Sequence, residues 1–134
     1  MHHPAKINTK HSEIWVDDEG FLVLNMEDGI EMDLEEVTAA FEAYAQLGYG
    51  KGKKTLQLMI AKESATMPPE ARKYVAEHGK HFFIASALVG QSLAIRLLVN
   101  FFNTFYKHDV PFRMFENEEA ARKWLRTFKS CLLR

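Results

Sequence analysis

Histidines are the side chains of this sequence best suited to metal binding or proton transfer, but their spacing favours neither role. The histidines near the start have no cysteine or carboxylate at ligand spacing, and no HExxH pattern occurs. Two others flank Gly79, where we expect a helix to end and a protonated imidazole to stabilise the helix dipole. We therefore predict no metal site and no catalytic histidine. The six residues are His2, His3, His11, His78, His81 and His108.

A carboxylate pair and a single thiol are the next candidates for catalysis. Glu35 and Glu36 follow Asp33 at the expected start of a helix, and Asp33 with Glu36 matches a capping box. Acidic side chains stabilise the positive end of a helix, so we expect a solvated helix start rather than an acid–base pair. Cys131 lies in an apolar tail with no base placed beside it. We predict no catalytic residue and no cofactor, and we do not expect an enzyme.

The segment 48–54, GYGKGKK, has the composition of a phosphate-binding loop. Such a loop leads from a strand into a helix, so that backbone amides and the helix dipole converge on the anion. Here the expected order is helix into strand, and the GxxxxGK[ST] pattern is absent. The segment is therefore interpreted as a basic surface linker.

Composition narrows the class of protein further. The 134 residues suit one domain with a substantial core, and a net charge of −1 offers no general attraction for nucleic acid. One cysteine forms no internal disulfide, which fits a cytoplasmic setting. No signal peptide and no apolar run of membrane-spanning length is expected, although peripheral membrane contact stays open.

The stretch from Phe82 to Lys107 organises the fold. Residues 82–89 form a short apolar run that predicts a strand buried on both faces, and Gly90 allows a turn. A helix then runs from Gln91 or Ser92 to Lys107, with apolar side chains over an arc of about 200°, twice what a surface helix needs. Two explanations stay open: a neighbouring helix covers the surplus, or the helix meets a partner.

The residues of this helix supply the candidate site. The expected partner or dimer face consists of Leu98, Phe101, Phe102, Phe105 and Tyr106. The extra apolar surface of the helix could instead line a pocket between the helix and the sheet. The polar groups of that pocket are then expected to be Ser86, Arg96 and Asn100.

Strands and helices alternate along the remainder of the chain. An opening hairpin (13–17 and 21–26) and an extended piece (30–32) precede a helix from residue 33 whose buried stripe is Leu34, Val37, Phe41, Tyr44 and Leu47. A strand (55–61), a helix from Pro68 to His78, a strand (112–115) and a last helix capped by Asn117 complete the set around the central stretch. The last helix has an exposed basic face: Arg122, Lys123, Arg126 and Lys129.

This order predicts an α/β fold of four β-α units with a mostly parallel sheet and an antiparallel N-terminal edge strand. We expect one domain over residues 12–129, between a loose segment 1–11 and a tail 130–134.

Four stretches resemble the SpoIIAA-like, or STAS-like, domains, and especially an uncharacterised bacterial branch described as STAS/SEC14-like. They are MDLEEVTAAFEAY (32–44), MPPEARKYVA (67–76), ALVGQSLAIRLLVNFF (87–102) and FRMFENEEAARKWL (112–125). The resemblance implies a SpoIIAA-like fold and action by docking onto protein partners. In the related anti-sigma-factor antagonists a serine after the second core strand is phosphorylated. Here Ser64 and Thr66 lie nearby, but the Asp-Ser-Ser-Gly motif is absent.

The sequence thus favours a non-enzymatic interaction or regulatory module that docks through the apolar face of helix 91–107 onto a protein partner or a second copy. The alternative is a binder of a small molecule or lipid, with a pocket between that helix and the sheet.

Overall fold

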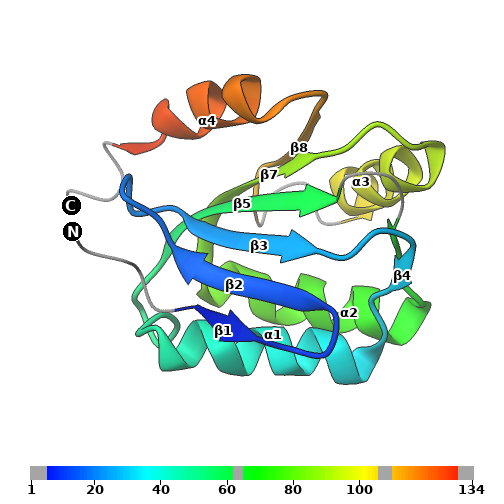
Figure 1. Cartoon of the computed structure of the whole chain (residues 1–134), viewed down its shortest axis with the longest axis horizontal. Helices are drawn as coiled ribbons and strands as arrows, with labels where there is room; N and C mark the ends of the chain where they lie inside the picture. Colours follow the sequence, from blue (N-terminus) through cyan, green and yellow to red (C-terminus); the bar gives the residue numbers. More distant parts are fainter. Residues whose placement is uncertain (1–5, 62–64, 106–109, 130–134) are drawn as a thin grey trace.

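The apolar strands expected from the sequence lie side by side in a six-stranded sheet. The computed structural model describes residues 6–61, 65–105 and 110–129, except for the side chain of Phe105. The strand order is β1 (Ile7–Asn8), β2 (Ser12–Val16), β3 (Leu22–Met26), β5 (Thr55–Ala61), β7 (Phe83–Val89) and β8 (Phe112–Phe115) (Figure 1). Pairing is antiparallel from β1 to β3 and parallel from β3 to β8, so the predicted α/β class is confirmed.

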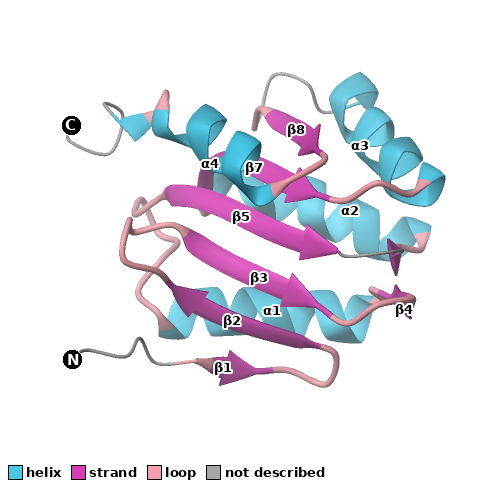
Figure 2. Ribbon diagram, turned by 45° about the horizontal axis from the view of Figure 1, so that its top comes forward, coloured by secondary structure: helices cyan, strands magenta, loops and turns pink. Residues whose placement is uncertain are grey.

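Helices cover the two faces of the sheet unequally. The four helices of the described part are α1 (Leu34–Gln46), α2 (Pro69–His78), α3 (Leu93–Phe105) and α4 (Glu118–Arg126), and a 3₁₀ turn (Gly79–His81) follows α2. Figure 2 shows α4 on one face and α1 and α2 on the other. Two apolar clusters correspond to these faces, one joining α4 to β5 and β7, the other joining α1, α2 and α3 to the sheet.

Two short strands were not expected. Residues 7–8, assigned to a loose segment, form β1 and pair with Glu13 and Ile14 of β2. β6 (Ala65–Thr66), in a stretch expected to be only a loop, pairs in parallel with β4 (Ile30–Glu31). Two-residue strands carry too little periodicity to be recognised before their partners are known.

The start of α1 differs from the predicted capping box. Asp33 Oδ1 accepts from the backbone N–H of Glu36, as expected, but the Glu36 carboxylate does not return to the cap. Glu36 is only 4% exposed, and its Oε2 accepts from Thr9 Oγ1, His11 N and Ser12 Oγ at 2.5, 3.1 and 3.1 Å. The expectation of a solvated glutamate was wrong, because donors from the β1–β2 segment satisfy this carboxylate inside the protein.

The buried stripe of α1 is largely as predicted. Val37, Phe41 and Tyr44 are buried and Leu47 is partly buried, whereas Leu34 in the first turn is exposed. The Phe41 ring makes edge contacts with the rings of Tyr44, Tyr74, Phe82 and Phe83, which ties α1 to α2 and β7.

Helix α3 lies at the end of the sheet toward which the parallel strands point (Figure 1). Its start follows the prediction, since Ser92 Oγ accepts from the backbone N–H of Ile95 at 3.2 Å. Gly90 permits the close approach that precedes it: an added Cβ there would lie 3.1 Å from the carbonyl oxygen of Ala61 and 3.3 Å from Ile95. The inner side of α3 is formed by Ile95, Val99 and Phe102, all buried.

Candidate functional site

An exposed apolar strip runs along the outer side of α3. Leu93 and Leu97 are 69% and 59% exposed, the most exposed large apolar side chains of the described residues. Phe101, one further turn along, is partly buried. Residues four apart form a continuous ridge on a helix surface. We call Leu93, Leu97 and Phe101 the α3 strip.

Cations border the α3 strip. The guanidinium carbon of Arg72, from α2, lies 4.5 Å from the centre of the Phe101 ring. Arg72 Nε is buried and has no hydrogen-bond acceptor among the described residues. Arg96 is exposed on α3, which contains no acidic residue. The border is therefore electrostatically suited to a surface that carries carboxylates.

A cavity lies on the opposite, inner side of α3. Its volume is about 100 Å³, and its walls come from α1, α2, α3 and the sheet, with Phe41, Ile95, Leu98 and Phe102 among the lining side chains. The lining is almost entirely apolar. This is where the sequence suggested a pocket if the helix enclosed one.

Three buried polar side chains interrupt the apolar lining. Ser86 Oγ donates to Gln57 Oε1 at 2.9 Å, and Gln57 Nε2 donates to Tyr44 Oη at 3.0 Å. All three line the cavity. Burial raises the pKa of Tyr44 well above its usual value, so the phenol remains a hydrogen-bond donor at all physiological pH values.

The residues expected on the partner face separate into different surroundings. Phe102 is a core residue, packed against Phe112, and is therefore not available to a partner. Leu98 lines the cavity, and Phe101 belongs to the α3 strip. The side chain of Phe105 and all of Tyr106 lie outside the described residues.

The other predicted site residues are also divided. Ser86 lines the cavity, but Arg96 and Asn100 point from the exposed side of α3 and do not line it. Ser64 lies outside the described residues. Thr66 is exposed in β6, and its carbonyl accepts from Met32 N at 2.7 Å. It therefore belongs to a strand before α2, and the N-cap position of α2 is taken by Pro68.

Sequence reasoning missed Leu93 and Gln57. A leucine three residues after a turn glycine looks like part of any apolar helix, and only the packing direction of α3 exposes it. Gln57 could have been noticed in the sequence, because it is a polar residue within the apolar strand 55–61. Ser86 is likewise the polar residue within the apolar strand 82–89. The structure pairs the two in register across β5 and β7.

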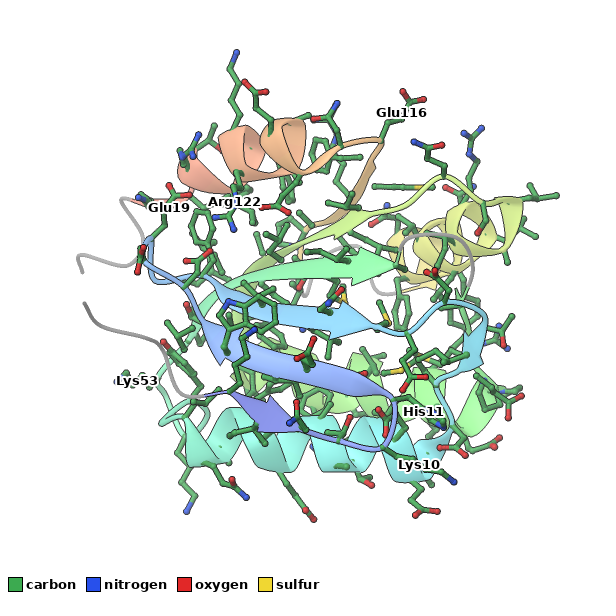
Figure 3. The ribbon with its side chains drawn as sticks, in the orientation of Figure 1. Lys10, His11, Glu19, Lys53, Glu116 and Arg122 are labelled. Atoms are coloured by element: carbon green, nitrogen blue, oxygen red, sulfur yellow. The ribbon has the colours of Figure 1, made fainter. Side chains whose placement is uncertain are left out.

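The sequence predicted a solvated basic face on α4, but three of its four cations are paired within the protein. Arg122 Nη1 lies 2.7 Å from Asp17 Oδ2 and 2.8 Å from Glu19 Oε2, and Arg126 Nε lies 2.7 Å from Glu19 Oε1. Figure 3 shows Glu19 and Arg122 close together. Lys129 Nζ also lies 3.7 Å from Glu19. These pairs join α4 to the β2–β3 turn, so this surface is an internal clamp rather than a site for an acidic partner. Lys123 and Arg126 are exposed as expected, but Lys123 is the only one of the four that makes no ion pair with the described residues.

The clamp makes stability depend on pH. Hydrogen bonds from Arg126, then Arg122, lower the pKa of Glu19 from 4.5 to about 2. A lowered pKa adds stability above the unfolded value, and that stability is lost as pH falls from about 4.5 toward 2. We expect Glu19→Gln to lose roughly 1–2 kcal/mol at pH 7, a figure reduced for solvent screening at this partly exposed group.

Urea unfolding of both proteins from pH 7 to pH 2 measures this effect. The two stability curves should converge as the pH approaches 2. Glu116→Gln is the control, because Glu116 is exposed and makes no ion pair among the described residues. A difference between Glu19→Gln and the parent protein that stays constant with pH would contradict the assignment.

Histidines do not assemble a metal site in the described part of the chain. No group of three or more histidine, cysteine, aspartate or glutamate side chains there is arranged to hold a metal ion. His78 stacks on Tyr74 with ring centres 4.1 Å apart, and His11 Nδ1 lies 3.7 Å from Glu27. The first is a packing contact between two rings, and the second joins a partly exposed histidine to an exposed glutamate.

Comparison with models of protein families assigns the chain to a family. The model of the family described as a domain of unknown function, DUF7793, matches residues 14–129. The chain belongs to the DUF7793 family. A search of curated proteins gives no significant match to this DUF7793 member.

A solved structure confirms the predicted fold of this DUF7793 domain. It is similar to an uncharacterized protein of the DUF3478 family with a SpoIIAA-like fold from Shewanella loihica PV-4, with a TM-score of 0.57. Identity is 18%, and the match covers 92% of each chain. At this identity the likeness establishes the SpoIIAA-like fold alone. None of the helices in the described ranges is long and apolar enough to cross a membrane.

Proposed function

We propose that this protein is a non-enzymatic binding module of the STAS-like type that docks a protein partner through the α3 strip. The observation that carries the proposal is the exposure of two leucines one turn apart, Leu93 and Leu97. Single exposed leucines are common on protein surfaces, but these two continue into Phe101 as one ridge.

The chemistry around the α3 strip supports one kind of partner. Arg72 is stacked on Phe101 without an acidic partner in the described structure, and Arg96 is exposed nearby on the same helix. A docking surface with an apolar centre and carboxylates at its edge complements both features. A second copy would bring two cationic strips together without an acid on either α3, so a different protein is the better match.

The double variant Leu93→Glu/Leu97→Glu tests this role. We expect it to weaken partner binding at least about 30-fold, because it places two charges at the centre of an apolar contact. Stability should change little, since neither side chain is part of the core. The measurement is quantitative affinity capture from the source cells with each variant as bait, with native mass spectrometry of each purified protein.

Ala45→Glu/Gln46→Glu is the matched control. It adds the same two charges to exposed helical positions of α1, which contributes no residue to the α3 strip. The proposal predicts a partner that the parent and the control retain and the strip variant loses. A dimer that dissociates only in the strip variant would identify the second copy as the partner. Equal capture profiles from monomeric proteins would contradict docking through the α3 strip.

A further inference from the structure

The cavity beneath α3 is lined by hydrogen-bond donors that are not all used within the protein. Ser86 and Tyr44 carry one hydroxyl hydrogen each, and the Gln57 amide carries two. Two hydrogen bonds join the three side chains, so two of the four hydrogens are used. The remaining two find no acceptor among the described residues.

This surplus does not depend on how the Gln57 amide is oriented. As assigned, Gln57 donates to Tyr44 and the phenol hydrogen is free. Exchanging the amide oxygen and nitrogen would reverse both bonds and leave the Ser86 hydrogen free instead. In either case a hydroxyl group that is at least nine-tenths buried is left as an unused donor at the cavity wall. Each of the three side chains has a partner within the protein, and the spare hydroxyl hydrogen is a buried donor that a bound acceptor could satisfy.

Volume and charge restrict what can satisfy these donors. An apolar cavity of roughly 150 Å³ in another protein holds benzene, whereas pockets for larger ligands reach roughly 300–1,000 Å³. A cavity of about 100 Å³ therefore suits a compact molecule rather than an acyl chain. Lys80 is the one charged residue of the lining and is itself exposed, so the interior favours a neutral group.

We propose that the cavity binds a small neutral molecule whose apolar body contacts α1 and α3 and whose single oxygen acceptor receives a hydrogen bond from the free hydroxyl of the Tyr44–Gln57–Ser86 chain, either that of Tyr44 or that of Ser86. A compact ketone, ether or alcohol has this chemistry. The site lies on the inner side of α3, away from the α3 strip, so it does not depend on docking.

The test compares cyclopentanone with methylenecyclopentane, which has the same shape but carries CH₂ in place of the oxygen. Dissociation constants are measured by ¹H–¹⁵N NMR titration of the full chain and of the variants Tyr44→Phe and Ser86→Ala. We expect one of the two variants to weaken cyclopentanone binding about five- to tenfold, because it removes the donating hydroxyl. Methylenecyclopentane binding should stay within about twofold in both variants, which also reports that the cavity is intact.

Three results would overturn the proposal. In the first, neither probe perturbs the resonances of Phe41, Ile95 and the other lining residues. In the second, both variants bind the ketone as tightly as the parent protein does. In the third, a crystal grown with cyclopentanone holds only a water molecule on the Tyr44–Gln57–Ser86 chain. Loss of ketone affinity in one variant with unchanged hydrocarbon affinity supports the proposal and identifies the donor.

Discussion

Ile95→Ala is expected to lower the free energy of unfolding by about 2–5 kcal/mol. Ile95 is fully buried at the start of α3, and its side chain lies against Gly90 at the turn from β7. Truncation removes apolar contacts and enlarges the space beneath the helix, because Gly90 has no side chain that could fill it. Urea unfolding followed by circular dichroism measures the loss.

Leu97→Ala provides the comparison on the same helix. Its side chain is mostly exposed, so we expect a change within about 0.5 kcal/mol. Similar losses in both variants would show that the outer side of α3 is covered within the protein, and the α3 strip would then not be a free docking surface. The pair therefore tests the division of α3 into an inner and an outer side.

Glu36→Ala should lower the free energy of unfolding by about 3 kcal/mol. The carboxylate is buried and accepts from Thr9, His11 and Ser12, so its removal leaves these donors without an acceptor beneath the β1–β2 segment. Amide hydrogen exchange should also quicken in β1, because Glu36 fixes this segment to α1. Denaturant unfolding and exchange followed by mass spectrometry measure the two effects.

Glu35→Ala is the matched control, since Glu35 is exposed in the same turn of α1. Both variants lose one negative charge near the helix start, so their difference isolates the buried hydrogen bonds from the helix-dipole effect. If the two lose the same stability, the dipole accounts for the effect and Glu36 does not anchor β1.

Local patterns were sufficient for most of the fold. The mostly apolar runs at 55–61 and 82–89 indicated strands, the second covered on both faces, and Asp33, Asn117 and residues 91–92 marked helix starts that the structure confirms. These signals are local because a cap or a strand period depends on residues within a few positions of each other. The alternation of the elements then left few possible topologies.

The burial and the partners of the charged residues could not be predicted from local patterns. Glu36 and Arg122 both follow patterns that are usual for solvated helix faces, yet one is buried beneath β1–β2 and the other is clamped by Asp17 and Glu19. The donors to Glu36 lie 24 or more positions away along the chain, and Glu19 lies 103 positions from Arg122. Contacts over such distances arise only when the sheet brings the N-terminal hairpin beside α1 and α4.

By itself, the sequence determined that helix 91–107 has too much apolar surface for one neighbour. It did not determine which half of that surface is core, because a helical wheel records angles and contains no information about the neighbours. The tertiary structure decided this by placing α3 at the ends of the parallel strands, with Ile95, Val99 and Phe102 inward. The same placement exposes Leu93 and Leu97 and makes the inner side of α3 one wall of the cavity over Tyr44, Gln57 and Ser86.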